Sequence, residues 1–305
     1  MGLLKEMKKK IYNSELIKRE YKKYCKDLGN VPAMEIIAPA PALQQNIASE
    51  NLLSEIRLYE KVRTLIKDDI FTIQFEDTLI QFCLPSATKD LIQKDIFTND
   101  AFFEENLLKK MRKYITPESI VLDAGTNIGN HTIFFSKICN AQKVYSFEPL
   151  KTVFSIFEKN LELNNIQNVE KYNLALGEKE GFASISGYNS TSVGSTQFEF
   201  SDNGSFEVIS LDSLNIDKLD FAKVDVEGCQ YEFLKGARNT LEKCKPIIWI
   251  EMLDEQNAWF GYDEEREIIL PQKLLTEMGY VLIEQMSNYD YLYIHKDNLQ
   301  NIKEY

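Results

Sequence analysis

Ile120-Val-Leu-Asp-Ala-Gly-Thr-Asn-Ile-Gly-Asn130 runs from a short apolar segment into a turn that contains two glycines. The apolar run 120–122 is typical of a parallel strand that is covered on both faces, and Gly125 and Gly129 let the backbone turn sharply. Residues 131–138 then read as a helix. Together these features predict the strand, turn and helix of a nucleotide-binding α/β domain.

Asp123 stands just ahead of the glycines and restricts the charge of a ligand at this turn. The N–H groups at the helix start would suit a phosphate, as in the Gly-x-Gly-x-x-Gly loop of dinucleotide-binding proteins. A pyrophosphate beside Asp123 would meet like-charge repulsion, whereas an ammonium and a sulfonium would be attracted. The turn therefore favours S-adenosylmethionine as ligand, and its alternative is a tight turn that binds nothing.

Glu148 supplies a second expected ligand contact. It ends the next predicted strand, Lys143-Val-Tyr-Ser-Phe-Glu148, and precedes Pro149. It lies about 20 residues beyond the glycine turn, the spacing at which an acid accepts hydrogen bonds from an adenosine ribose. Without the turn, Glu148 would read as a solvated acid at a strand end. With the turn, the ribose role is the better interpretation.

Five blocks follow one another along the chain: 121–132, Phe147-Glu-Pro149, Leu211-Asp-Ser-Leu214, Lys223-Val-Asp-Val-Glu-Gly228 and Leu234-Lys-Gly-Ala237. In this order they resemble the blocks of FkbM-type methyltransferases, from about residue 90 to residue 296. The resemblance implies an S-adenosylmethionine-dependent O-methyltransferase of a kind that commonly acts on sugars or polyketides. Thr126 stands where the family usually has Ala, and Gln230 where it often has Glu. We therefore leave Gln230 out of the chemistry.

The resemblance and the turn together assign a set of cofactor-binding residues. These are Asp123, Gly125, Asn127, Gly129, Asn130, Thr132, Glu148, Pro149, Ala175 and Asp225.

Strands and helices alternate from residue 98 onward. We expect helices at 101–114, 131–138, 151–164, 230–243 and 264–278, and strands at 120–124, 143–148, 169–175, 221–226, 246–252, 280–284 and 291–296. This alternation predicts a mainly parallel, Rossmann-like sheet of the class I methyltransferase type with an antiparallel edge. Ligands bind beyond the carboxyl ends of such strands, so Asp123, Glu148, Asp225 and Glu251 should gather at one rim.

Catalysis should depend on acids at this rim. A sugar hydroxyl is a weak nucleophile until its proton is removed, and crowded carboxylates such as Asp225, Glu227 and Glu251 can provide a base. Two of them could instead bind a hard cation such as Mg²⁺, but no specific motif supports this, so we assign no metal ligands. In their structural alternatives, Asp225 holds the methionine ammonium or a helix start, and Glu227 caps the following helix.

His131 is the other candidate base. A histidine titrates near neutrality, but this one opens the helix beside the turn, where the helix N-terminus disfavours its protonated form. Its alternative role is packing or hydrogen bonding beneath the cofactor.

The amino-acid composition restricts the kinds of partner and site that this protein can have. The 305 residues include 44% hydrophobic ones, enough for a domain of about 200 residues with an appendage. A net charge of -12 disfavours nucleic acid as a substrate. The five cysteines show no Cys-x-x-Cys spacing, which disfavours a disulfide framework or a zinc site. No signal peptide or bilayer-length apolar run is seen, and we expect a cytoplasmic protein.

The N-terminal part reads as an accessory region over residues 1–85, before a methyltransferase domain over 86–305. Residues 1–26 form a basic amphipathic pattern with nine Lys or Arg against three Glu. Such a helix packs on its own domain or on a second subunit, as in a homodimer; alternatively it lies on the inner membrane face beside a lipid-linked sugar acceptor. A connector, a helix over 47–67 and a hairpin of 70–75 with 79–84 complete the region.

Two further features suggest acceptor contacts. The polar stretch 187–196 is a candidate lid or a solvated loop. Trp249, Trp259, Phe260 and Tyr262 could stack on a sugar face, with Trp249 itself expected in the core.

A nicotinamide-dependent sugar oxidoreductase and a non-catalytic nucleoside-binding scaffold remain as alternative functions. The oxidoreductase would need a glycine-richer turn and usually a Tyr-x-x-x-Lys pair, which residues 101–296 lack.

Overall fold

The computed structural model describes residues 67–187, 196–201, 203–252 and 263–302. The chain divides into two compact units, Met1–Asp68 and Asp69–Tyr305, and almost all described residues belong to the second. Within the described ranges, no helix has both the length and the apolar character that crossing a bilayer requires. The predictions for residues 1–66 lie outside the described residues.

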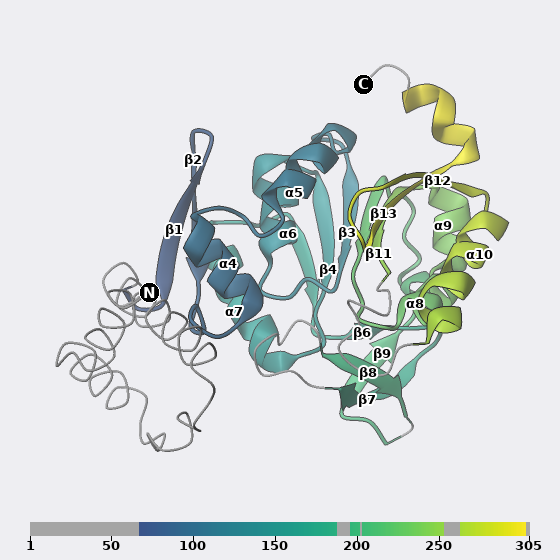
Figure 1. Cartoon of the computed structure of the whole chain (residues 1–305), viewed down its shortest axis with the longest axis horizontal. Helices are drawn as coiled ribbons and strands as arrows, with labels where there is room; N and C mark the ends of the chain where they lie inside the picture. Colours follow the sequence, from purple (N-terminus) through teal and green to yellow (C-terminus); the bar gives the residue numbers. More distant parts are fainter. Residues whose placement is uncertain (1–66, 188–195, 202, 253–262, 303–305) are drawn as a thin grey trace, which may run out of the picture. The chain divides into compact units, whose positions relative to one another are not determined.

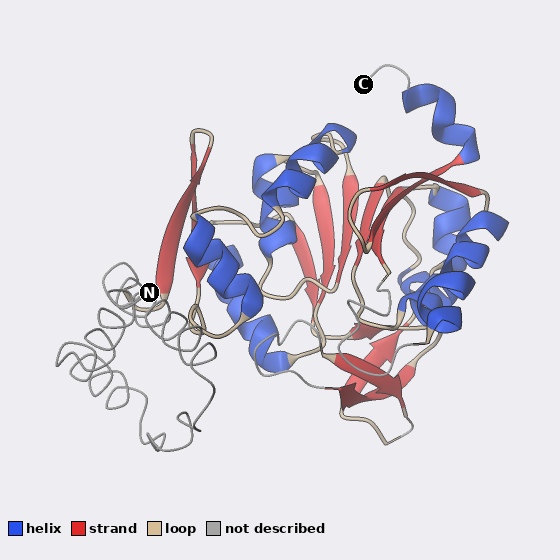
Figure 2. Cartoon of the chain, in the orientation of Figure 1, coloured by secondary structure: helices blue, strands red, loops and turns tan. Residues whose placement is uncertain are grey.

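A seven-stranded sheet forms the centre of the second unit (Figures 1 and 2). Strands β11 (Ile247–Glu251), β10 (Phe221–Val224), β3 (Ile120–Ala124), β4 (Lys143–Phe147) and β5 (Val169–Tyr172) pair in parallel with one another, while β13 (Asp290–His295) is antiparallel to both β11 and β12 (Tyr280–Gln285). This arrangement confirms the predicted Rossmann-like sheet with its antiparallel edge. The order across the sheet is β12, β13, β11, β10, β3, β4 and β5.

Helices follow the parallel strands, near the predicted positions. They are α6 (Asn130–Ile133) with the π-helical turn η2 (Phe134–Ile138), α7 (Lys151–Leu163), the 3₁₀ turn η4 (Leu211–Leu214), α8 (Gln230–Gly236), α9 (Arg238–Cys244), the π-helical turn η5 (Glu265–Ile269), α10 (Leu270–Glu277) and the 3₁₀ turn η6 (Lys296–Ile302). The predicted helix 230–243 is thus two helices.

The predicted helix 101–114 begins later than expected. It consists of α5 (Glu105–Met111) and the 3₁₀ turn η1 (Arg112–Tyr114), and a helix that we did not predict, α4 (Leu91–Asn99), precedes it. Asp100 and Glu104 have left-handed backbone conformations, with φ of 53° and 56°. These two residues separate the helices because a right-handed helix cannot continue through such a conformation.

The two faces of the sheet carry different side chains. Leu122, Ala222 and Ile248 belong to an apolar cluster with residues of α8, α9 and α10. On the other face, which packs against α6 and η2, Asp123 is paired in register with Lys223, and Lys223 with Trp249. Because side chains alternate along a strand, these three lie in one row on that face. The sheet therefore buries a polar row directly beneath its carboxyl edge.

A second, four-stranded sheet occupies the connection between β5 and β10, and we did not predict it. Its order is β6 (Ala175–Leu176), β9 (Phe206–Ile209), β7 (Gly181–Gly187) and β8 (Gln197–Phe200). The predicted strand 169–175 is consequently too long: β5 ends at Tyr172, and Ala175 begins β6. Of the polar stretch expected to be a lid, residues 188–195 lie outside the described residues.

The predicted hairpin is confirmed as β1 (Ile70–Phe75) and β2 (Thr78–Cys83). Two side chains of α7 bind its backbone: Asn160 accepts a hydrogen bond from the Cys83 N–H at 2.6 Å, and Asn164 accepts one from the Gln81 N–H at 3.0 Å. The hairpin, which is part of the second unit, is thereby held against α7. The boundary expected near residue 85 stays a prediction.

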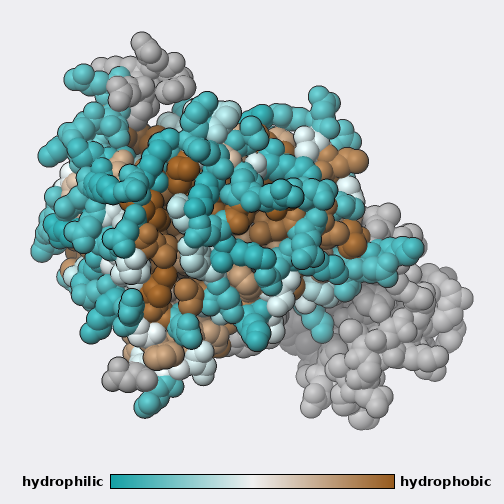
Figure 3. Space-filling model, turned by 180° about the vertical axis from the view of Figure 1, so that it is seen from behind, coloured by the Kyte–Doolittle hydropathy of each residue, from teal (hydrophilic) through white to brown (hydrophobic). Residues whose placement is uncertain are grey.

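Strand β12 lies at one edge of the large sheet and exposes apolar side chains. Val281, Leu282 and Ile283 are 42%, 45% and 42% exposed. Viewed from behind, apolar side chains interrupt a mainly hydrophilic surface (Figure 3). A register shift between Leu282 and Glu284 makes the edge irregular, which limits its pairing with a further strand.

Candidate active site

The glycine turn passes very close to β10, and this contact requires Gly125. Its φ is +87°, and a Cβ added there would lie 1.7 Å from the carbonyl oxygen of Asp225. The N–H groups of Gly125 and Thr126 both donate to the carbonyl oxygen of Phe147. The turn is therefore held between the carboxyl ends of β4 and β10.

Asp123 is fully buried beneath this turn. Its Oδ2 accepts a hydrogen bond from the hydroxyl of Thr132 at 2.5 Å, while its Oδ1 has no partner among the described residues. Burial raises the pKa of the Asp123 carboxyl above its usual value, although His131, Thr132 and Lys223 lower it. A buried carboxylate oxygen without a partner is costly, so a cation or donor near Oδ1 would stabilise the site.

Glu148 forms one side of the turn. Its Oε2 accepts a hydrogen bond from the N–H of Asn127 at 3.0 Å, and its Oε1 accepts one from the N–H of Leu150 at 2.8 Å. Burial raises the pKa of Glu148 to about 7, although these two hydrogen bonds lower it. Glu148 therefore changes charge in the neutral pH range.

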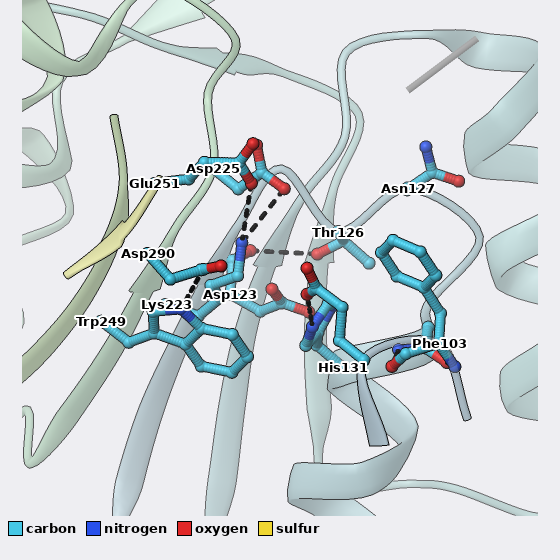
Figure 4. Close-up of polar contacts among 12 residues, drawn as sticks. Phe103, Asp123, Thr126, Asn127, His131, Lys223, Asp225, Trp249, Glu251 and Asp290 are labelled. Carbon is cyan, nitrogen blue, oxygen red and sulfur yellow. Dashed lines mark hydrogen bonds and ion pairs between the residues drawn. The ribbon is translucent and has the colours of Figure 1, made fainter. Parts of the chain in front are cut away.

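Lys223 lies at the centre of the acids, and we did not single it out from the sequence. Its side chain is 1% exposed, with Nζ 3.0 Å from Oδ2 of Asp225 and 4.0 Å from Oε2 of Glu251 (Figure 4). The same Nζ lies 5.2 Å from the centre of the Trp249 ring. Burial lowers the pKa of Lys223, but the surrounding carboxylates outweigh it and raise the pKa above its usual value. Lys223 is therefore charged and balances part of the acid cluster.

The pKa values of Glu227 and Glu251 are both raised. Burial, followed by the negative charge of Asp225, raises the pKa of both carboxyl groups well above the usual value. Glu227 also has a left-handed backbone, with φ of 42°. Because a raised pKa brings a carboxylate closer to neutrality, each of these groups is better suited to accept a proton than an ordinary Glu.

His131 belongs to a small network on the α6 side of the site. Its Nε2 lies 3.2 Å from Oε2 of Glu104, and its ring packs edge-on against Trp249 at 5.2 Å between ring centres. Trp249 in turn donates a hydrogen bond from Nε1 to Oδ1 of Asp290 at 2.6 Å. Burial is the largest effect on the pKa of Glu104 and raises it, but the hydrogen bond and charge of His131 outweigh burial and lower it.

Comparison with known proteins assigns the chain to a family. Residues 123–282 match the family model described as Methyltransferase FkbM domain. The chain belongs to the FkbM methyltransferase family. This family comprises S-adenosylmethionine-binding methyltransferases, which agrees with the predicted cofactor.

Individual relatives are distant. Methyltransferase 1 of Beauveria bassiana is 23% identical over 197 residues, which cover 54% of this chain and 74% of that protein. Hexuronic acid methyltransferase AglP of Haloferax volcanii is 26% identical over 179 residues, covering 57% of this chain and 71% of that protein. The crystal structure of methyltransferase FkbM from Methylobacillus flagellatus KT aligns with a TM-score of 0.43 and 14% identity. That alignment covers 80% of this chain, which spans only 60% of the other.

Within this FkbM-family chain, the predicted rim residues are brought together. Asp225 lies against Gly125 and beside Lys223, which also faces Glu251. Asp123 and Glu148 lie close enough for each to be influenced by the charge of Asp225. The carboxyl ends of β3, β4, β10 and β11 thus form the acidic rim that the strand pattern predicted.

Other predicted cofactor residues have mainly structural contacts. Asn130 binds the backbone of Phe103 in both directions, accepting from its N–H at 3.0 Å and donating to its carbonyl oxygen at 2.9 Å. Thr132 is buried between Asp123 and Ser146. Ala175 packs in the core of the four-stranded sheet.

The backbone of the turn has its own supports. Asn127 has a φ of 52° and accepts a hydrogen bond from the N–H of Ile128 at its own side chain. Gly129 has a φ of +92°, and a Cβ there would lie 2.5 Å from the ring of Phe157. The carbonyl oxygen of Pro149 accepts a hydrogen bond from the Asn173 amide.

Both residues that depart from the family pattern make side-chain hydrogen bonds to the backbone. Thr126 is 1% exposed and donates its hydroxyl to the carbonyl oxygen of Asp123 at 3.0 Å, so the hydroxyl is satisfied within the turn. Gln230 donates from Nε2 to the backbone carbonyl oxygen of Glu251 at 3.0 Å. Gln230 therefore supports the end of β11.

Of the four aromatic residues expected near the acceptor, the structure describes only Trp249. Trp249 is fully buried, as expected, whereas Trp259, Phe260 and Tyr262 lie outside the described residues. No group of three His, Cys, Asp or Glu in the described ranges is arranged to hold a metal ion.

Sequence reasoning missed three charged residues of this site: Lys223, Glu104 and Asp290. A signal existed for Lys223, because a lysine within the buried strand Phe221–Val224 needs a partner for its charge. Glu104 and Asp290 had no comparable local signal, since each is separated from its partner by many residues of sequence.

Proposed function

We propose that this protein is an O-methyltransferase that transfers the methyl group of S-adenosylmethionine to a hydroxyl of a sugar in a glycan or glycolipid precursor. The main observation behind the proposal is the pair of carboxyl groups with raised pKa values, Glu227 and Glu251, at the ends of two neighbouring strands. Bound S-adenosylmethionine supplies an electrophilic methyl group on a cationic sulfur.

The residues of the turn fit such a donor. Glu148 would accept hydrogen bonds from the ribose hydroxyls, and the acidic wall of Asp123 and Asp225 would favour the cationic methionine end. Oδ1 of Asp123 has no partner in the described structure, so the site contains a buried acceptor for a donor group of the ligand. Gly125 allows the two walls to approach each other.

The strand order supports separate positions for the donor and the acceptor. Glu148 follows β4 on one side of β3, whereas Glu227 and Glu251 follow β10 and β11 on the other side. The acceptor hydroxyl would therefore approach from the β10 side and lose its proton to Glu227 or Glu251 as the methyl group is transferred. His131 is the second candidate base, held by Glu104. The sugar class is supported by the distant relative named hexuronic acid methyltransferase.

The first experiment is calorimetric titration of the full chain with S-adenosylhomocysteine. Folded protein that does not bind it would refute the proposed cofactor site. The second is transfer of labelled methyl from S-adenosylmethionine to cell-envelope sugar extracts, followed by chemical identification of the methylated atom. Label on nitrogen or on a carboxyl group would refute O-methylation of a hydroxyl.

Matched variants then identify the base. Glu227→Gln and Glu251→Gln are each compared with Glu207→Gln, which changes an exposed residue of β9. Loss of the base should lower kcat by about a hundredfold or more, with affinity for S-adenosylhomocysteine within about twofold of the unaltered protein. If neither variant lowers kcat, the base is elsewhere, and His131→Asn is the next test.

The alternatives make different predictions. Family membership does not favour a nicotinamide-dependent oxidoreductase. A nucleoside-binding scaffold would bind S-adenosylhomocysteine and transfer no methyl group to any acceptor, and Asp225→Ala would leave its biological activity unchanged.

We also propose that residues 1–85 are an accessory region to the methyltransferase domain at 86–305. Its basic segment 1–26 would bring the enzyme to an anionic membrane surface that carries a lipid-linked acceptor, or would pack on a second subunit in a homodimer. Co-sedimentation of the full chain with anionic and neutral vesicles, together with its mass in solution, separates the two arrangements.

A further inference from the structure

The acceptor side of the proposed site has a second wall, contributed by β8 and η5. A Cβ added at Gly228 would lie 3.2 Å from Oε1 of Glu267 and 3.7 Å from Nε2 of Gln197. The adjacent Cys229 thiol donates to the carbonyl oxygen of Phe198 at 3.6 Å, which holds β8 against the same loop. Gly228 is therefore flanked by a carboxylate and an amide, immediately after the candidate base Glu227.

Glu267 has a buried oxygen that faces no donor. Its side chain belongs to a residue that is 7% exposed, and its Oε2 has no hydrogen-bond partner among the described residues. Burial is the main effect that raises the pKa of Glu267, although Arg266 lowers it. Burial of an acceptor without a donor is costly, so a ligand hydroxyl or ammonium at this position would be stabilising.

Each described cation near this wall lies beside a carboxylate, although Nζ of Lys223 has no hydrogen-bond partner among the described residues. Lys223 lies between Asp225 and Glu251, and the Arg266 guanidinium lies 3.2 Å from Glu232. His131 on the other side of the site pairs with Glu104. Among the described residues, an anionic group entering between Glu227 and Glu267 would therefore meet carboxyl groups, and each cation near them already lies beside a carboxylate.

We propose that the acceptor ring of this enzyme carries no carboxylate or phosphate, and that the wall of Glu227, Gly228 and Glu267 selects a neutral or amino-bearing sugar. This inference rests on the proposed sugar O-methyltransferase function and goes beyond it by naming the charge class of the acceptor. Glu267 accepts a hydrogen bond from a hydroxyl or ammonium group of that ring, and Gln197 donates one. The acceptor therefore differs in charge from the acid in the name of the Haloferax relative.

The test reads the charge of the methylated sugar itself. The full chain is incubated with labelled S-adenosylmethionine and cell-envelope glycan extract, and the labelled product is hydrolysed in acid to monosaccharides and separated by anion exchange. Methyl ethers survive this hydrolysis, whereas methyl esters release methanol. We expect the label on monosaccharides that the anion exchanger does not retain.

The other possible results distinguish a failure of this inference from a failure of the proposed function. Label on a retained, acidic monosaccharide would overturn this inference and leave the proposed function standing. Label released as methanol, label on nitrogen, or no transfer at all by protein that binds S-adenosylhomocysteine would overturn the proposed function, and the inference with it.

A variant tests the wall directly. Glu267→Gln should raise KM for the acceptor about tenfold or more, the size of a hydrogen bond to a charged group, while kcat and S-adenosylhomocysteine affinity change less than about twofold. Glu277→Gln, on the exposed side of the following helix, is the matched control and should change none of these. An unchanged KM, or an equal loss of donor affinity, would show that Glu267 does not contact the acceptor.

Discussion

Replacement of Lys223 by Met tests whether a buried cation holds the acid cluster together. The lysine side chain is 1% exposed and lies 3.0 Å from Asp225 and 4.0 Å from Glu251. Methionine has a similar length and keeps the apolar stem beside Trp249, so the change removes charge with little change in volume. The substitution therefore isolates the electrostatic contribution of the ammonium group.

The expected loss follows from burial. Removal of one partner of a buried ion pair typically costs about 3–5 kcal/mol, because the remaining charge is left buried without compensation. The surrounding carboxylates raise the pKa of Lys223 in the folded protein. The stability that its charge provides is therefore fully present below the pKa of an unfolded lysine, about 10.4. It is lost only as the pH rises through the pKa of Lys223 in the folded protein. At neutral pH we therefore expect the free energy of unfolding to fall by about 3–5 kcal/mol.

The loss should also depend on pH. Without Lys223, which lowers the pKa of Glu251, that pKa in the folded protein rises further above the value of about 4 that a carboxyl group has in the unfolded chain. A carboxyl group with a raised folded pKa destabilises the fold as the pH rises from the unfolded value through the folded value. The deficit should therefore be largest at neutral pH and should shrink as the pH falls toward 5.

Urea unfolding followed by tryptophan fluorescence measures this loss at several pH values. Lys171→Met is the matched control, because Lys171 lies on the edge strand β5 of the same sheet in an exposed ion pair with Glu158. Such pairs contribute about 0–1 kcal/mol. A loss below about 1 kcal/mol for Lys223→Met, or a loss that is the same at every pH, would contradict the role that we assign to its charge.

Three further predictions concern the turn and its supports. Gly125→Ala should lower the midpoint of thermal unfolding and abolish S-adenosylhomocysteine binding, because the added Cβ would overlap the carbonyl group of Asp225. Gly181→Ala is the control and should be neutral, because no atom lies within 4 Å of the Cβ added there. Equal behaviour of the two variants would contradict the close approach of the turn to β10. Because the pKa of Glu148 is raised to about 7, S-adenosylhomocysteine should bind more tightly as the pH rises from 6 to 8. Glu148→Gln should bind about tenfold more weakly and lose this pH dependence in calorimetry, and a retained dependence would exclude Glu148 as its source. Asn130→Ala removes both hydrogen bonds to Phe103 and should destabilise the protein by about 1–3 kcal/mol in urea unfolding, and an unchanged midpoint would show that they contribute little.

Much of the fold could be predicted because its signals are local. Short apolar runs separated by amphipathic helices predicted the parallel strands, and their ends carry Asp123, Glu148 and Glu251 within one or two residues of the observed bounds. The small sheet β6 to β9 had no such signal. Its strands are short, partly exposed and paired across intervening loops, so their sequences resemble those of a connection.

The sequence was sufficient to establish the family, the sheet and the acids at its rim, since each follows from residues close together in the chain. The balance of charge within that rim depends on folding. Asp123, Lys223 and Trp249 form one row only because β3, β10 and β11 pair in a particular register, and Glu104 and Asp290 join them from distant segments. Register between parallel strands is set by the packing of their faces, which no single strand encodes. For that reason the buried lysine among the carboxylates, and the position of Glu267 beside Gly228, became visible only in three dimensions.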